Sequence, residues 1–178
     1  MIPKRILAAL VVFLSAFGLF SQQEVVLKIS EGMPMINLAI PEFVVRTPTP
    51  AAQAAAAEIH QALSADAAYS RIFQPLPKAH YGYIRPLNPE KIHFKDWDSV
   101  QARLLLTGEV REDGGRFVFD GKVYDVRSER FIVGKRYQAD KAGLRLVAHK
   151  MADELMKLHG EKPIFTTKVA FVSNRDGN

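Results

Sequence analysis

The sequence predicts an α/β protein, a two-layer sandwich in which two main helices pack on one side of a mixed β-sheet of about five strands. Two observations lead to this fold class. Runs with strand-like apolar patterns recur along the chain, and two longer runs carry apolar residues at helical spacing. The 178 residues, 48% of them hydrophobic, suffice for one domain of ordinary size.

The beginning of the chain has the pattern of a signal peptide. Lys4 and Arg5 form a short basic region, and the apolar run from Ile6 to Phe20 is shorter than the ~20 residues that span a bilayer. We therefore expect residues 1–21 to be a cleavable signal peptide and the protein to be periplasmic. An uncleaved N-terminal anchor is the alternative. The absence of cysteine excludes disulfides, thiolate catalysis and a lipoprotein anchor.

Two strands are expected before the first helix. Val25, Leu27 and Ile29 alternate with polar or outward positions in the first, and "MINLAIPEFVV" (35–45) predicts the second. Because the first strand follows directly after the expected cleavage site, we expect it to be mobile or to lie at an edge of the sheet.

The run "TPAAQAAAAEIHQALSADAAY" (49–69) predicts the first helix. Thr49 can cap it, and Pro50 fits the first helical position. Small side chains make the apolar stripe thin, so the helix can lie close to the sheet. The stripe consists of Ala52, Ala56, Ile59 and Leu63. The following "YSRIFQPLP" predicts a short strand, and four prolines between Pro75 and Pro89 indicate an irregular loop.

Three consecutive strands follow a short helical turn. The turn is "DWDSVQ", with Asp96 as its expected cap. The strands are "ARLLLTGEV", "RFVFDGKVYDV" and "FIVGKRYQA", and Asp113-Gly114 is a strong turn signal between the first two. The continuous "LLL" indicates a central strand that is buried on both faces.

The second helix is predicted over "DKAGLRLVAHKMADELMKLHG" (140–160). Asp140 can cap its start, and Gly160 with Pro163 ends it. Its apolar stripe is Leu144, Val147, Met151, Leu155 and Leu158.

Few residues suggest chemistry. Asp96-Trp97-Asp98 has the D-x-D pattern of some metal sites, but a helix cap beside a buried Trp explains it better. His149 and Asp153 lie four residues apart on the side of the second helix away from its stripe. They can form a base and its orienter, although a surface or semi-buried hydrogen bond is the more ordinary interpretation.

Other candidates are weaker still. The remaining histidines have no zinc-site spacing, and Gly108 is better explained by close backbone packing or a bulge than by a ligand. The basic residues of "GKRYQADK" fit a solvated edge strand. We therefore expect no enzyme: no catalytic residue, metal, cofactor, small-molecule substrate or nucleic-acid partner.

The stretch "AHKMADELMKLHGEKPIFTTKVAFVS" resembles the TolB amino-terminal domain family of the Tol–Pal system. The family pattern matches Ala148, His149, Ala152, Asp153, Leu158, Gly160, Phe165 and the strand 168–172. Looser matches are "EVVLKISEGMPMINLAIPEF", "EIHQALSADAAYSRIFQPL" and Trp97 with "LLLTGEV". The family pattern differs at Gln101, Arg103 and Pro163, which indicates a distant relative.

The resemblance implies a domain organisation. Residues 22–33 would be a mobile N-terminal strand and linker, 34–163 the α/β domain, and 164–178 the incomplete start of a first β-propeller blade. In the family, the propeller contacts the lipoprotein Pal. The N-terminal segment contacts the inner-membrane protein TolA by adding a strand to the sheet of TolA.

We therefore expect a non-enzymatic periplasmic adaptor for envelope integrity and cell division, with a TolA-like partner. An edge strand offers unpaired backbone groups that a second sheet can complete. The expected partner-binding residues are Glu24, Val25, Val26, Leu27, Lys28 and Ile29. Two alternatives stay open: a generic envelope-assembly domain, and an accessory domain of a propeller-containing peptidase.

Overall fold

The structure is a computed structural model that describes residues 34–167. Its core is a mixed six-stranded sheet in the order β3-β1-β4-β5-β6, with β2 paired to β4 beyond the end of β1. Strands β1, β2 and β3 run parallel to their neighbours, and β4, β5 and β6 form an antiparallel meander. The strands are β1 (Ile36–Ala39), β2 (Val44–Val45), β3 (Phe73–Pro75), β4 (Leu104–Asp113), β5 (Arg116–Asp125) and β6 (Arg130–Ala139).

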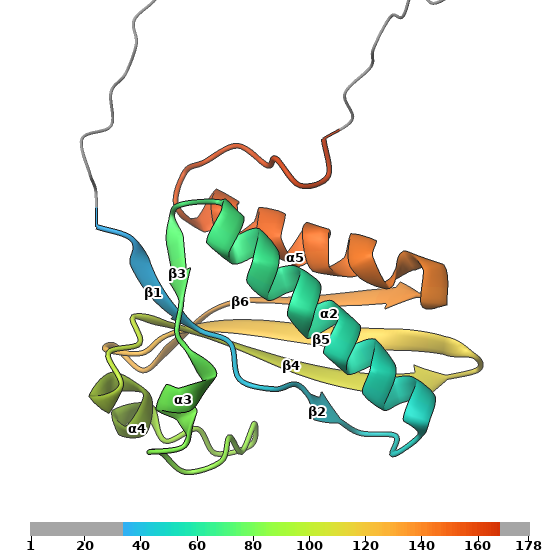
Figure 1. Ribbon diagram of the computed structural model, residues 1–178, viewed down its shortest axis with the longest axis horizontal. Coiled ribbons are helices and arrows are strands. Elements are labelled where there is room, and N and C mark those ends of the chain that lie inside the picture. Colours follow the sequence, from blue (N-terminus) through green and yellow to red (C-terminus); the bar gives the residue numbers. More distant parts are fainter. Residues whose placement is uncertain (1–33, 168–178) are drawn as a thin grey trace, which may run out of the picture. The chain divides into compact units, whose positions relative to one another are not determined.

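Two long helices cover one face of this sheet. Helices α2 (Pro50–Tyr69) and α5 (Leu144–Leu158) lie side by side over it (Figure 1). The shorter elements are α3 (Lys78–Tyr81), α4 (Phe94–Ser99) and the 3₁₀ turn η1 (Lys141–Gly143). The predicted α/β fold class, with two main helices on one side of a mixed sheet, is confirmed. None of the helices within residues 34–167 is long and apolar enough to cross a membrane.

Helix α2 begins and packs as the sequence predicts. The Thr49 hydroxyl accepts a hydrogen bond from the Ala52 N–H at 3.1 Å, and Pro50 occupies the first turn. The whole predicted stripe of Ala52, Ala56, Ile59 and Leu63 is buried. Because most of the buried face is alanine, α2 approaches both α5 and the sheet closely.

Helix α5 ends before Gly160 as predicted, but it begins later than predicted and Leu158 is more exposed than expected. Asp140 caps η1 instead of the α-helix itself, accepting the Gly143 N–H at 2.9 Å. Leu158, the last residue of the helix, is 37% exposed, so it does not belong to the buried stripe. Gly160 has φ +75°, a left-handed conformation that closes helices at low energetic cost.

The predicted single strand over residues 35–45 is wrong. The structure divides it into β1 and β2, separated by Ile40–Phe43. Pro41 has no N–H to donate to a sheet. The chain therefore leaves β4 after Ala39, which pairs with Leu105, and rejoins β4 where Val44 pairs with Glu109. This break creates the groove described below.

The far face of β1 and β4 carries a second, smaller core. Trp97 is its centre at 3% exposure, packed with Ala39, Leu105 and Val126. The proline-rich loop, predicted as irregular, includes the short helix α3 and contributes several side chains to this core. They are Leu76, Tyr81, Ile84, Leu87 and Ile92.

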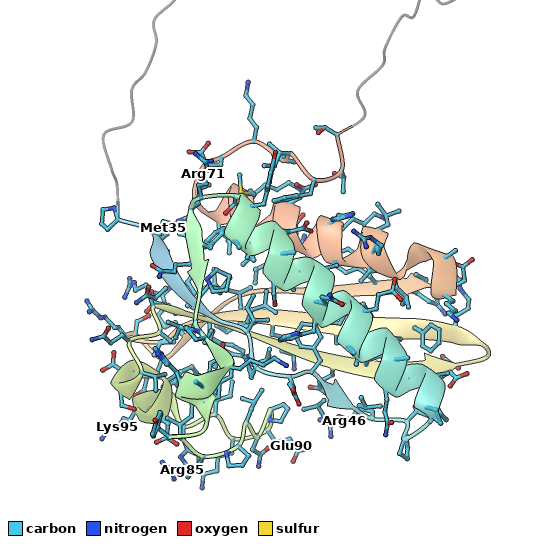
Figure 2. All side chains as sticks on the ribbon, viewed as in Figure 1. Met35, Arg46, Arg71, Arg85, Glu90 and Lys95 are labelled. Atoms are coloured by element: carbon cyan, nitrogen blue, oxygen red, sulfur yellow. The ribbon has the colours of Figure 1, made fainter. Side chains whose placement is uncertain are left out.

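The prediction that Asp96 caps the helical turn is also wrong. Helix α4 begins two residues earlier, at Phe94, and His93 occupies the capping position. Asp96 instead receives two hydrogen bonds from the guanidinium of Arg85, at 2.7 and 2.9 Å. Arg85 reaches outward at the lower rim of the molecule, where Arg46 and Glu90 also lie (Figure 2).

Close packing explains Gly108, as expected. A Cβ atom at this position would lie 2.5 Å from a Phe43 ring carbon and 2.6 Å from a Phe119 ring carbon. The register of β4 and β5 is continuous at Gly108, so no bulge occurs there. Gly108 therefore leaves the space into which the aromatic ring of Phe43 inserts.

We expect Gly108→Ala to lower the free energy of unfolding by about 1–3 kcal/mol, because the added methyl group overpacks two aromatic rings. Chemical denaturation monitored by circular dichroism measures the change. Gly82→Ala is the matched control: its Cβ would lie 3.5 Å from the nearest atom, and we expect a change within about 0.5 kcal/mol. Equal effects of the two substitutions would contradict this account of Gly108.

Candidate functional site

The expected partner-binding residues lie outside the part of the chain that the structure describes. Glu24–Ile29, the signal peptide over residues 1–21 and the strand over 168–172 are not among residues 34–167. The described chain starts at Pro34 and enters β1 at Ile36, with Met35 48% exposed. The role of Glu24–Ile29 therefore stays a prediction.

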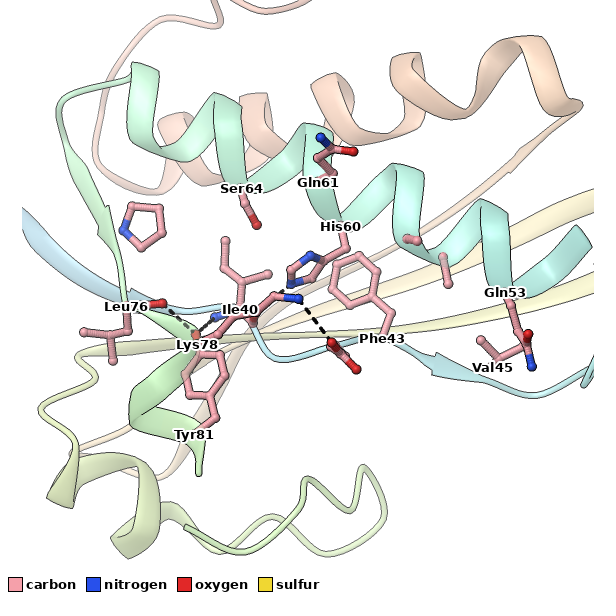
Figure 3. Close-up of a pocket in the computed structure, with 14 residues that line it drawn as sticks. Ile40, Phe43, Val45, Gln53, His60, Gln61, Ser64, Leu76, Lys78 and Tyr81 are labelled. Carbon is pink, nitrogen blue, oxygen red and sulfur yellow. Dashed lines mark hydrogen bonds and ion pairs between the residues drawn. The ribbon is translucent and has the colours of Figure 1, made fainter. Parts of the chain in front are cut away.

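A groove lies where the chain leaves β4 between β1 and β2. It has a volume of about 630 Å³ and runs between α2 and the segment from Pro75 to Tyr81 (Figure 3). Ile40, Phe43 and Val45 line one wall, and the short side chains of α2, including Ala56 and Ala57, line another. The groove exists because β3 ends at Pro75, so no strand lies beside β2 on this side.

Two side chains satisfy the backbone of Ile40 at the break. The Ile40 N–H donates to the Tyr81 hydroxyl oxygen at 2.9 Å, and the Tyr81 hydroxyl donates to the Leu76 carbonyl at 3.3 Å. Nε2 of His60 lies 2.9 Å from the Ile40 carbonyl oxygen and donates to it, since a carbonyl only accepts. Burial raises the pKa of Tyr81, which keeps its hydroxyl protonated as a donor.

The groove suits an apolar or extended segment better than a reaction. The Phe43 ring fills its floor, 5.2 Å from the His60 ring and 5.1 Å from the Phe119 ring. The charged residues at its mouth, Glu42 and Lys78, form an exposed ion pair at 3.1 Å, which contributes little energy. Ser64 and His60 both line the groove, and Nε2 of His60 is already engaged with the Ile40 carbonyl oxygen.

His149 and Asp153 do not pair with each other. Nδ1 of His149 lies 2.7 Å from the Asp66 carboxylate, which joins α5 to α2. Asp153 is only 3% exposed, although the helical wheel places it away from the apolar stripe of α5. The reason is that the outgoing chain after α5 folds back over this side of the helix.

Asp153 anchors that outgoing chain. Its carboxylate accepts the backbone N–H groups of Ile164, Phe165 and Thr166, each at 3.0 Å, and the Thr166 hydroxyl. The Phe165 ring lies parallel to the His149 ring, with centroids 6.5 Å apart. The two polar residues thus fix the helix pair and the direction in which the chain leaves it. Sequence patterns alone do not reveal Asp66 or Thr166 as partners.

Asp96-Trp97-Asp98 is not arranged as a metal site in the structure. The Arg85 hydrogen bonds lower the pKa of Asp96, and Asp98 is exposed. Across residues 34–167, no three His, Asp or Glu side chains are grouped as metal ligands would be. Burial, together with the charges of Glu154 and Asp153, raises the pKa of Tyr137 to about 12, so this hydroxyl stays neutral.

Comparisons with known proteins agree with one another. A family model described as the TolB amino-terminal domain matches residues 25–132. A Tol-Pal system protein TolB from Syntrophotalea carbinolica is 30% identical over 179 residues, which cover 98% of this chain and 41% of the relative. The TolB of Nitrosococcus oceani is 41% identical over 113 residues, 62% of this chain and 26% of the relative.

A solved structure shares the fold. The crystal structure of TolB from Acinetobacter baumannii superposes with a TM-score of 0.55 at 17% identity, covering 72% of this chain and 29% of that one. At this identity the likeness shows the fold alone. The chain spans less than half the length of each of these relatives.

Asp153→Ala is expected to lower the free energy of unfolding by about 2–3 kcal/mol, because three backbone N–H groups lose a charged acceptor. Hydrogen exchange should show the amides of Ile164–Thr166 exchanging faster, while those of β4 and β5 stay protected. Asp98→Ala removes an exposed carboxylate and serves as the control, with a change within about 0.5 kcal/mol. Unchanged exchange at Ile164–Thr166 would rule out the anchoring role.

His159 gives the protein an acid-sensitive contact. Its ring packs 5.2 Å from that of Phe73, and burial lowers the pKa of His159. The unfolded chain therefore binds the proton more readily, so stability is full above the ordinary pKa near 6.5 and falls as the pH drops through it. We expect His159→Gln to flatten the loss of unfolding free energy between about pH 7 and pH 5. His80→Gln, at an exposed position, should keep the slope, and an unchanged slope in His159→Gln would contradict the assignment.

Proposed function

Because the chain belongs to the TolB amino-terminal domain family, we propose that it is a non-enzymatic adaptor that binds a TolA-like partner through Glu24–Ile29. The observation that carries this proposal is the family match over residues 25–132, which begins inside that segment and ends within the first residues of β6. The relatives are named as Tol-Pal system proteins. The proposed work of the domain is thus to connect proteins of the cell envelope.

The proposed contact is strand addition. Val25, Leu27 and Ile29 alternate along the segment, so an extended conformation presents them on one side. Such a strand supplies backbone hydrogen bonds to a partner's sheet edge, while alternate side chains enter its pockets. Residues 30–33 separate the segment from Pro34, the first described residue, and β1 begins at Ile36.

A binding role fits the way polar groups are used in the described domain. Arg85 engages Asp96, Asp66 engages His149, and Asp153 holds the outgoing backbone. These contacts are structural, and each occupies a group that the sequence made a candidate for chemistry. What the described domain offers a partner is surfaces and strand edges.

The proposal extends to the surroundings of the domain. Residues 1–21 would direct export to the periplasm, and residues 22–33 would form the mobile strand and linker. The domain would occupy residues 34–163, and residues 164–178 would open the first blade of a β-propeller. Pal would be contacted by that propeller, and the anchoring of Ile164–Thr166 by Asp153 would set its orientation.

An NMR titration tests the proposed contact. Residues 22–178 are titrated with the C-terminal periplasmic domain of the TolA protein from the same organism, and we expect shifts or broadening confined to residues 24–32. Leu27→Pro should weaken binding at least roughly tenfold, because it removes a backbone donor and prevents a regular strand. Gln22→Pro, which introduces the same residue outside Glu24–Ile29, is the control and should bind as the parent does.

Two results would count against the proposal. Shifts that centre on the groove around Phe43 and His60 would show a different binding surface. No response at millimolar partner would leave the family membership intact and make the chain an envelope domain with another partner.

A further inference from the structure

Strand β6 forms the long open edge of the sheet. Within residues 34–167 its only strand neighbour is β5, and no other described residue forms a hydrogen bond with its backbone. It spans ten residues, whereas β3 at the opposite edge spans three and ends in a proline. Half of the backbone N–H and C=O groups of an edge strand point away from the sheet and can pair with another strand.

The strand is basic along its length. Arg130, Lys135 and Arg136 lie in β6, and the strand contains no acidic residue. Such charges commonly protect an edge from pairing with a copy of itself. A second molecule would bring the same three cations to the shared seam with no acid to meet them.

Neighbouring acids only partly compensate these cations. Glu154 contacts Lys135 at 3.0 Å but is shared with Lys157 at 2.8 Å. Asp120 contacts Arg136 but is shared with Arg111 at 2.8 Å.

The remaining cations add to this excess. On β4, which β5 separates from β6, the Glu109 carboxylate is likewise shared between Arg46 and Lys122. Arg130 forms no ion pair with any residue of the described chain. The edge and the sheet face beside it therefore carry more cations than acids.

Apolar surface accompanies the charge at the start of β6. Phe131 is 56% exposed and Ile132 is 39% exposed. The Phe131 ring lies over Gly134 and 5.7 Å from the ring of Tyr124, so it is held in place and still open to a partner. An added strand would cover both side chains.

We propose that β6 accepts an extended segment of another polypeptide in which an apolar stretch adjoins an acidic stretch. Its backbone completes the open edge. Its carboxylates meet Lys135 on one face of the sheet and Arg136 on the other, and its apolar side chains cover Phe131 and Ile132. This goes beyond the proposed function, in which the chain donates a strand from its N-terminus. Here the folded body receives one, at a different place.

Fluorescence anisotropy tests the proposal with a labelled peptide, as long as β6, that has valines in one half and glutamates in the other. We expect the neutralised variant R130Q/K135Q/R136Q to bind roughly tenfold more weakly. The matched variant K91Q/K150Q/K162Q removes the same charge from exposed positions elsewhere and should bind within about twofold of the parent. Thermal unfolding of both variants confirms that they fold, since Asp120 and Glu154 keep Arg111 and Lys157 as partners.

Hydrogen exchange locates the peptide. Bound peptide should slow exchange of amides within Arg130–Ala139 and leave the groove residues unchanged. A peptide with proline in place of valine keeps the charge but cannot pair as a strand, and it should not bind. Any one of five results would overturn the proposal. The proline peptide could bind equally well, or the peptide could slow amide exchange only outside Arg130–Ala139. The matched variant could lose as much affinity as the neutralised one, single-stranded RNA could bind more tightly than the peptide, or the protein could sediment as a dimer.

Discussion

The insertion of Phe43 over Gly108 is the contact on which the described fold depends most. The ring needs the space that a side chain at Gly108 would fill, and it packs on Phe119 and His60. Phe43 is buried just after Pro41, where the chain leaves β1 before it enters β2. His60 and Tyr81 then satisfy the backbone of Ile40 at the break, and the groove opens beside it. One missing Cβ atom thus shapes the sheet edge and the surface next to it.

Polar contacts fasten the other end of the helix layer. Asp66 and His149 join α2 to α5, and Asp153 holds the chain that leaves α5. A buried carboxylate that accepts several backbone N–H groups is a strong and directional contact. The residues that carry the family resemblance, His149 and Asp153, therefore have a structural reason to be there. They fix where the chain goes next.

Local patterns predicted what is local in this protein. The start of α2 at Thr49, the buried β4 and the end of α5 at Gly160 each follow from a few neighbouring residues. Periodicity could not reveal that Phe43 packs over Gly108 beside the break at Pro41, because the two residues lie on segments far apart in the sequence. A helical wheel also could not show that Asp153 is buried. It places a residue relative to its own helix and not relative to a chain that folds back over that helix. The basic residues of β6 predict a solvated edge strand, and β6 is an edge strand. Its excess of cations over acids becomes visible only in the ion pairs across the sheet.

We propose that this domain connects proteins through backbone pairing while its folded body stays unchanged. A crystal structure of the chain bound to the C-terminal periplasmic domain of the TolA protein is the sharpest test. Residues 24–29 should form an added strand on the partner's sheet, with Phe43 still packed over Gly108. A complex in which the partner fills the groove beside Phe43, or displaces that ring, would contradict it.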